Sequence, residues 1–215
     1  MKKITLLLLA TTIIFSTFAQ SKKYNDAMLK NIAQIDSAFL KPETFISLSN
    51  NFERIGNKEK SQWLPFYYAA LCRVNYAYMQ KDVNGNDAIA TYATTLINKA
   101  DSLQQNNSEI SCIKSMIASV QMLVNPQQRY MTYGTTVQKE LQNAMKQDST
   151  NPRPYLLKGQ GLKYTPAQFG GGCKTALPIL KTALEKFTTF KPAMDIAPNW
   201  GDEYNNKMIK ECEGK

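Results

Sequence analysis

Chemically active residues are scarce in this chain, because none of its 215 residues is a histidine. Catalysis by Ser-His-Asp or Cys-His groups, histidine-ligated metals and imidazole pH switches are therefore all excluded. The sequence also places no base next to a nucleophile, and no carboxylate spacing indicates glycoside hydrolysis. We expect a protein that is not an enzyme and that holds no cofactor or metal ion.

A glycine-rich segment, residues 164–172, is the most distinctive stretch of the sequence. Its candidate contact residues for a ligand or partner are Phe169, Gly170, Gly171 and Gly172. Lys174 and Thr175 follow, as they do in a phosphate-binding loop, but Cys173 separates the glycines from Lys174 and a helix precedes instead of a strand. We therefore reject a nucleotide site and expect the segment to fold back over its neighbours with Phe169 as an apolar plug.

The N-terminus has the three parts of a secretory signal peptide, which we assign to residues 1–19. Lys2 and Lys3 come first, an apolar run follows, and small residues stand before a cleavage position after Ala19. An uncleaved membrane anchor is the alternative, although the apolar run is short for a spanning helix. The sequence thus predicts export to the periplasm or the exterior of a Gram-negative bacterium, with no transmembrane span after cleavage.

Export changes the interpretation of the cysteines, because disulfides form in oxidising compartments. The four cysteines are Cys72, Cys112, Cys173 and Cys212. They allow three connectivities, and none has the close spacing of a redox or zinc motif. We favour Cys173–Cys212, which would join the start of one helix to the end of the last. Cys72 and Cys112 either pair with each other or lie as small residues in the core.

The remainder of the chain has helical apolar spacing, with no convincing strand pattern. The expected helices are two within residues 22–58, then residues 61–80, 86–104, 109–124 and 127–146, a pair beginning at Pro154, and residues 202–211. Asn86 or Asp87 is expected to cap the helix that it begins. Residues 61–80 carry more aromatic side chains than one buried stripe needs, so Tyr67 and Tyr76 are candidates for contact with a partner or ligand.

The spacing of small and large residues resembles that of tetratricopeptide repeat (TPR) proteins. Tyr155 and Gly159 match the first helix of a repeat, and Ala176, Leu180 and Ala183 match the second. The resemblance covers roughly residues 61–189, and it implies an all-α, TPR-like solenoid of antiparallel helix pairs with a C-terminal capping helix. HEAT-like and other α-solenoids are the alternative.

This architecture implies a division into a signal peptide (1–19), an N-terminal helical cap (20–60), three TPR-like pairs (61–190) and a C-terminal cap (191–215). Trp200 precedes the last helix and is expected to dock on the third pair, with ligand contact as the alternative. The basic excess, a net charge of +9, lacks the dense runs of a nucleic-acid protein.

Two binding functions fit these features, and a structural protein without a ligand is a third possibility. The first is a non-catalytic scaffold of the cell envelope that binds a partner protein or peptide in the concave groove. The alternative is a small-ligand accessory of an envelope transport system, which would use the glycine-rich loop and the aromatic helix. The resemblance of that loop to an insertion in exported TPR-like proteins implies the second use.

Overall fold

Helices make up the fold in a computed structural model that describes residues 22–214; the predicted signal peptide lies outside this range. No strand occurs between residues 22 and 214. The elements are a helix over residues 22–32, α2 (Ile35–Ala38), α3 (Glu43–Lys58), α4 (Leu64–Met79), the 3-10 turn η1 (Val83–Gly85), α5 (Asn86–Leu103), α6 (Ser108–Val124), α7 (Pro126–Arg129), the π-helical turn η2 (Tyr130–Gly134), α8 (Thr135–Gln147), α9 (Arg153–Tyr164), the 3-10 turn η3 (Ala167–Phe169), α10 (Cys173–Thr189) and α11 (Asp202–Glu213).

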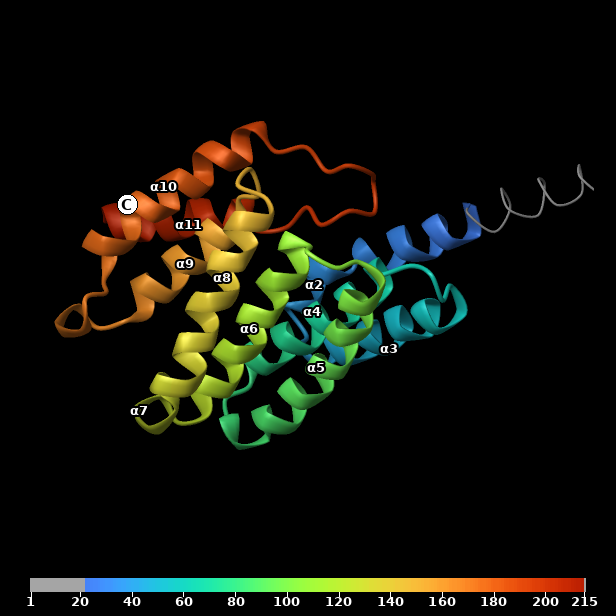
Figure 1. The fold of residues 1–215 in the computed structure, drawn as a ribbon, viewed down its shortest axis with the longest axis horizontal. Coiled ribbons are helices and arrows are strands. Elements are labelled where there is room, and N and C mark those ends of the chain that lie inside the picture. The colour runs from blue at the N-terminus through green and yellow to red at the C-terminus, as the bar shows by residue number, and fades with distance from the viewer. Residues whose placement is uncertain (1–21, 215) are drawn as a thin grey trace, which may run out of the picture.

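Successive helices pack as antiparallel pairs, α4 with α5, α6 with α8, and α9 with α10 (Figure 1). The first helices of the pairs also contact one another, α4 with α6 and α6 with α9, while α11 packs on α10. The all-α class and the paired arrangement therefore agree with the sequence. The identity of the pairs as TPR units and the proposed division of the chain remain predictions.

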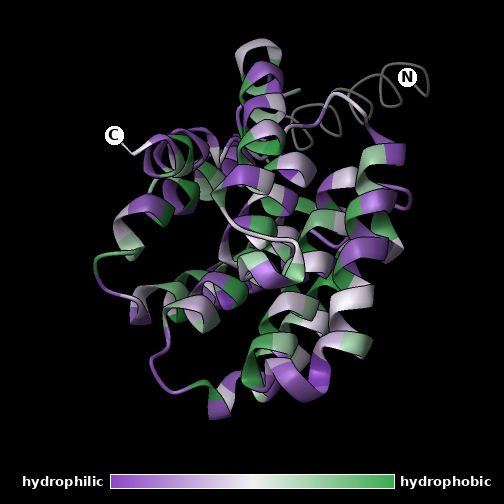
Figure 2. Cartoon of the chain, turned by 90° about the vertical axis from the view of Figure 1, so that its left-hand side faces the viewer, coloured by the Kyte–Doolittle hydropathy of each residue, from purple (hydrophilic) through white to green (hydrophobic). Residues whose placement is uncertain are grey.

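The apolar faces of the helices meet in two clusters. The larger cluster extends from the helix of residues 22–32 to α6, and the smaller one joins α9, α10 and α11. Figure 2 shows hydrophobic residues concentrated along one side of many helices and polar residues along the other. Trp200 packs against both clusters, so it docks on the third pair as predicted and also reaches the first.

The motif residues of the last pair lie at a close helix crossing. Ala176, Leu180 and Ala183 are fully buried on α10. Gly159 faces them from α9, where an added Cβ would lie 2.5 Å from Leu180 Cδ2. Glycine is thus required by the approach of the two helices rather than by a turn.

The predicted helix over residues 127–146 is interrupted. It divides into α7, η2 and α8, and the ring of Tyr130 lies against Gly134, where a Cβ would come within 3.0 Å.

The prediction that Asn86 or Asp87 caps the helix that starts there is wrong, because neither side chain caps α5. Asp87 instead binds the guanidinium of Arg129 through both carboxylate oxygens, at 2.6 and 2.8 Å.

The glycine-rich loop does not use Phe169 as a plug, because that side chain is 73% exposed. The loop is held by its own backbone: the amide of Gly172 donates to the carbonyl of Leu162 at 2.8 Å. Gly170 and Gly172 have positive φ, and a Cβ on Gly171 would collide with the carbonyl oxygen of Thr165. Compact folding of the loop therefore leaves its aromatic tip in solvent.

The Cys173–Cys212 disulfide is confirmed, with the two Cα atoms 5.0 Å apart. It ties the first residue of α10 to α11. Cys72 and Cys112 are free and buried, so they do not pair with each other. Burial raises the pKa of both thiols, which keeps them protonated and unreactive.

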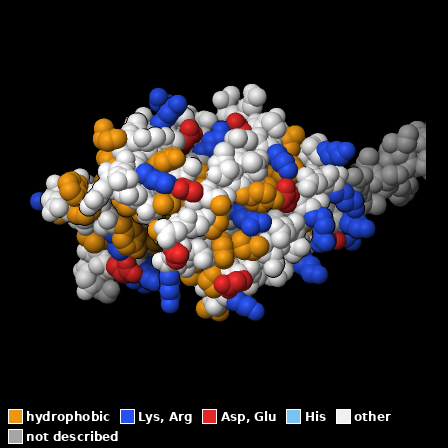
Figure 3. All heavy atoms as spheres, turned by 90° about the horizontal axis from the view of Figure 1, so that it is seen from below, with side chains coloured by type: hydrophobic (Ala, Val, Ile, Leu, Met, Phe, Trp, Pro, Cys, Tyr) orange, Lys and Arg blue, Asp and Glu red, His pale blue; other side chains and the backbone are white. Residues whose placement is uncertain are grey.

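Charged side chains are unevenly placed on the face seen from below in Figure 3, where Lys and Arg gather at the N-terminal end of the described chain. Basic, acidic and apolar side chains alternate over the rest of that face.

Within residues 22–214, no helix has both the length and the hydropathy needed to cross a bilayer.

Replacing both Cys173 and Cys212 with serine should lower the free energy of unfolding by about 4 kcal/mol. The disulfide joins residues 39 apart, and opening such a loop restores that much chain entropy to the unfolded state. Urea denaturation, monitored by circular dichroism, measures the change. Reductant should destabilise the wild type equally and leave the variant unaffected; equal stability of oxidised wild type and variant would contradict the expectation.

Candidate functional site

A pocket of about 700 Å³ lies where the turns between helix pairs meet the segment that joins α10 to α11. We call that segment, residues 190–201, the strap. The volume falls within the range of small-molecule sites. The lining residues are Trp63, Asn106, Asn107, Ser108, Glu109, Gln147, Asp148, Thr150, Asn151, Thr189, Phe190, Lys191, Pro192, Ala193, Ala197 and Pro198.

The polar side of the pocket is made by residues that begin helices. Asn107 accepts hydrogen bonds from the amides of Glu109 and Ile110, at 2.9 and 3.3 Å, and so caps α6. Asn151 accepts from the amide of Arg153 at 2.9 Å where α9 begins. Asparagine suits these positions because its side-chain oxygen replaces the missing intrahelical acceptor. The same turns that end one pair and begin the next therefore place amide groups around the pocket.

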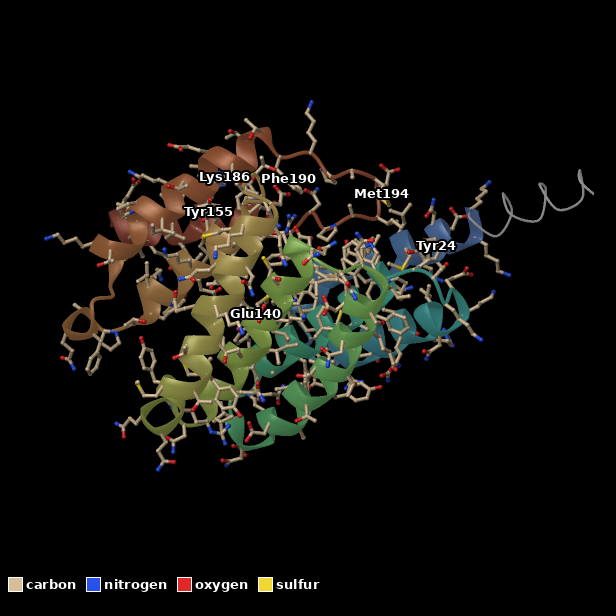
Figure 4. All side chains as sticks on the ribbon, in the orientation of Figure 1. Tyr24, Glu140, Tyr155, Lys186, Phe190 and Met194 are labelled. Carbon is tan, nitrogen blue, oxygen red and sulfur yellow. A yellow bond between two sulfur atoms is a disulfide. The ribbon has the colours of Figure 1, made fainter. Side chains whose placement is uncertain are left out.

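The apolar side comes from helix ends and from the strap. Trp63 immediately precedes α4, and Phe190 immediately follows α10. Figure 4 shows Phe190 where the strap leaves α10 and Met194 at the far turn of the strap. Prolines and alanines of the strap complete this side, so one wall is aromatic and aliphatic while the facing turns carry amides and hydroxyls.

A buried ion pair supports the floor of the pocket. Nη1 of Arg153 donates to Oε1 of Glu109 at 2.9 Å, and the two side chains are 0% and 13% exposed. Asn151 donates to the same oxygen at 2.7 Å, and the hydroxyl of Tyr67 donates to Oε2 at 3.1 Å. The carboxylate thus receives three hydrogen bonds, which offset part of the cost of burying its charge.

Burial raises the pKa of Glu109, while the charge of Arg153 and the donors from Tyr67 and Asn151 act in the opposite direction. Burial also raises the pKa of Tyr67 well above its ordinary value, and the neighbouring carboxylate adds to that shift. Tyr67 therefore keeps its proton and remains a hydrogen-bond donor to Glu109.

The same network anchors half of the strap. Nη2 of Arg153 donates to the carbonyl of Pro198 at 2.7 Å, and the indole of Trp200 donates to the Tyr67 hydroxyl at 2.8 Å. The hydroxyl of Tyr68 donates to the carbonyl of Ile196 at 3.0 Å. The guanidinium of Arg153 also lies over the rings of Phe190 and Trp200, 4.7 and 5.2 Å from their centroids.

The outer half of the strap, residues 191–195, has no such anchors. No group in this stretch hydrogen-bonds to a helix of the described part of the chain; the amide of Ala197 donates to the carbonyl of Met194 within the strap. Lys191, Ala193 and Asp195 are exposed. The pocket therefore has one fixed wall, residues 196–200, and one weakly held wall.

The candidate contacts named from the sequence are scattered. Tyr67 has no exposed surface, so a ligand cannot touch it in this conformation, and its role is to link Glu109 with Trp200. Tyr76 packs partly buried against the larger core cluster. Phe169 and the glycines from Gly170 to Gly172 lie at the α9–α10 turn and do not line the pocket. Trp200 belongs to the strap but does not line the pocket, and its hydrogen bond to Tyr67 anchors the strap.

Glu109, Arg153 and Asn151 were missed by sequence reasoning. The polar turns at residues 104–107 and 148–152 do mark the positions of the pocket along the chain, but each resembles an ordinary interhelical connection. Their meeting in space depends on how successive helix pairs stack.

Within residues 22–214, no group of three or more acidic or cysteine side chains is arranged to hold a metal ion.

Comparison with known proteins identifies one informative relative. The HusA haemophore from Porphyromonas gingivalis is 36% identical, superimposes with a TM-score of 0.80, and the match covers 89% of this chain and 93% of that chain. No protein-family model and no curated protein matches the sequence.

Replacing Arg153 with methionine should cost about 3–5 kcal/mol of stability, because it leaves the buried Glu109 carboxylate without its counter-ion. Glu109→Gln should also destabilise, and the double variant should lose less than the sum of the two changes. Chemical denaturation of the four proteins measures the coupling.

Lys181→Met is a matched control, since it removes an ion pair of similar length, 2.9 Å to Glu213, whose lysine is 52% exposed. Its cost should stay below about 1 kcal/mol. Additive effects of the Arg153 and Glu109 substitutions would show that the pair does not act as a unit.

Proposed function

This chain belongs to the family of the HusA haemophore, and on that premise we propose that it is an exported carrier that binds haem or a related porphyrin without chemically changing it. The observation that carries the proposal is the 36% identity over 93% of the relative's length, a match that takes in nearly the whole fold. The small-ligand alternative from the sequence is thus favoured over the peptide-binding scaffold.

The pocket has the features that such a ligand requires. Haem has a flat, largely apolar ring with two carboxylate side chains, the propionates, at one edge. Trp63, Phe190 and the strap prolines offer an apolar wall, and the asparagines of the opposite turns offer hydrogen-bond donors. A volume of about 700 Å³ is of the right order for a ligand of that size.

Recognition in this pocket would depend on the ring and its carboxylates rather than on the iron. The usual axial ligands are histidine, cysteine, methionine and tyrosine. The chain contains no histidine, and the residues that line the pocket include none of the other three. Ring stacking and carboxylate hydrogen bonding then supply the affinity, and a porphyrin without iron should bind nearly as well as haem.

Export and the absence of catalysis belong to the same proposal. The predicted signal peptide and the Cys173–Cys212 disulfide both support an oxidising location outside the cytoplasm. A TPR-like solenoid with an N-terminal cap, three pairs and a C-terminal cap is the architecture that we propose for the carrier. An outer-membrane uptake system or another envelope protein would receive the ligand.

Titration of the mature chain with haem should give saturable binding, seen as a shift of the porphyrin absorption band and quenching of tryptophan fluorescence. Trp63→Ala should weaken binding about tenfold, because it removes stacking and buried apolar area worth about 1.4 kcal/mol. Phe169→Ala removes an exposed aromatic ring at the distant α9–α10 turn and should bind as the wild type does.

Metal-free protoporphyrin IX separates ring recognition from iron ligation. We expect its dissociation constant to lie within about threefold of that for haem, since no axial ligand lines the pocket. Failure of the wild type to bind either compound would refute the proposed function, whereas binding of haem alone would place the site at residues other than those of the pocket.

A further inference from the structure

Three charged side chains of the described chain line the pocket, and one of them, Lys191, differs from the others in its charge and its contacts. Among the lining side chains that belong to residues 22–214, Lys191 is the sole cation, and the two acids are Glu109 and Asp148. The Glu109 carboxylate is already paired with Arg153. The Asp148 carboxylate accepts from the amide and hydroxyl of Thr150, at 2.8 and 2.6 Å. The ammonium of Lys191 is therefore the one lining charge that attracts an anionic group of a ligand.

The side chain of Lys191 is also available to a ligand. It is exposed and makes no hydrogen bond or ion pair in the described structure. Lys186, five residues earlier in the chain, is different. Its ammonium donates to the carbonyl of Ser149 at 2.7 Å and lies over the ring of Tyr155. Figure 4 shows Lys186 and Tyr155 near each other, to the left of Phe190.

The position of Lys191 on the strap gives the ammonium room to follow a ligand. It is the first residue of the outer half, residues 191–195, which has no hydrogen bond to any of the described helices. The preceding residue, Phe190, is fixed by the hydrogen bond that its amide donates to the carbonyl of Lys186 and by its ring under Arg153. A lysine directly beyond a fixed aromatic residue can move its charge while the ring stays in the pocket wall.

We propose that Lys191 determines ligand specificity by pairing with a carboxylate of the bound ligand, and that this pairing holds the outer half of the strap over the pocket. The inference rests on the proposed function and names its chemical class: a flat apolar ring that carries a free carboxylate, in haem a propionate. The same ring with its carboxylates masked lacks the partner that Lys191 needs.

The test compares protoporphyrin IX with its dimethyl ester on three proteins, the wild type, Lys191→Glu and Lys174→Glu. Lys174 is an exposed lysine at the start of α10, the opposite end of that helix from the strap. Both substitutions change the net charge equally, so Lys174→Glu controls for long-range electrostatics. Fluorescence titrations at fixed salt and fixed co-solvent give all six dissociation constants.

We expect Lys191→Glu to weaken the diacid about tenfold, to leave the ester within twofold, and Lys174→Glu to leave both within twofold. Raised salt should reduce the difference between wild type and Lys191→Glu for the diacid. Equal losses for both ligands, or no loss for the diacid, would overturn the role of Lys191 while the proposed function stands. Binding of neither ligand by the wild type would overturn both.

Discussion

The buried ion pair of Arg153 and Glu109 is the constraint on which the rest of the site depends. Neither charge can be removed from water alone, so each must be surrounded by partners. Those partners come from α4 through Tyr67, from the α8–α9 turn through Asn151 and from the strap through Pro198. One electrostatic requirement thus brings segments from distant parts of the sequence into a single arrangement, and the pocket is the space left above them.

Fixed and movable parts of the site are separated by this network. Residues 196–200 are tied to the helices by Tyr68, Arg153 and Tyr67, whereas residues 191–195 have no comparable bonds. The carrier that we propose has to hold its ligand and also release it. An aromatic wall and a supported floor provide binding surface that is organised in advance, and a loosely held wall allows entry and exit without disturbing the core.

Local patterns in the sequence were enough for the helices other than that of residues 127–146 and for their pairing, because these depend on periodicity and on neighbouring elements. The Cys173–Cys212 bridge was the favoured one of three possible connectivities. The docking of Trp200 was also predictable from its place before the last helix. Glu109 and Arg153 could not be recognised, because a buried ion pair between residues 44 positions apart has no local signature. Phe169 was misjudged for the converse reason: the loop backbone satisfies itself, so its aromatic residue is not needed as an anchor.

The disulfide has a topological consequence for the pocket. Cys173 lies before the strap and Cys212 lies after it, so the strap belongs to a covalently closed ring that also contains α10 and most of α11. A protease that cuts the exposed outer half would open the ring at one point without detaching α11 from α10. The wall most accessible to attack is therefore also the part of the chain where a single cut leaves all pieces joined, a useful property wherever proteases are abundant.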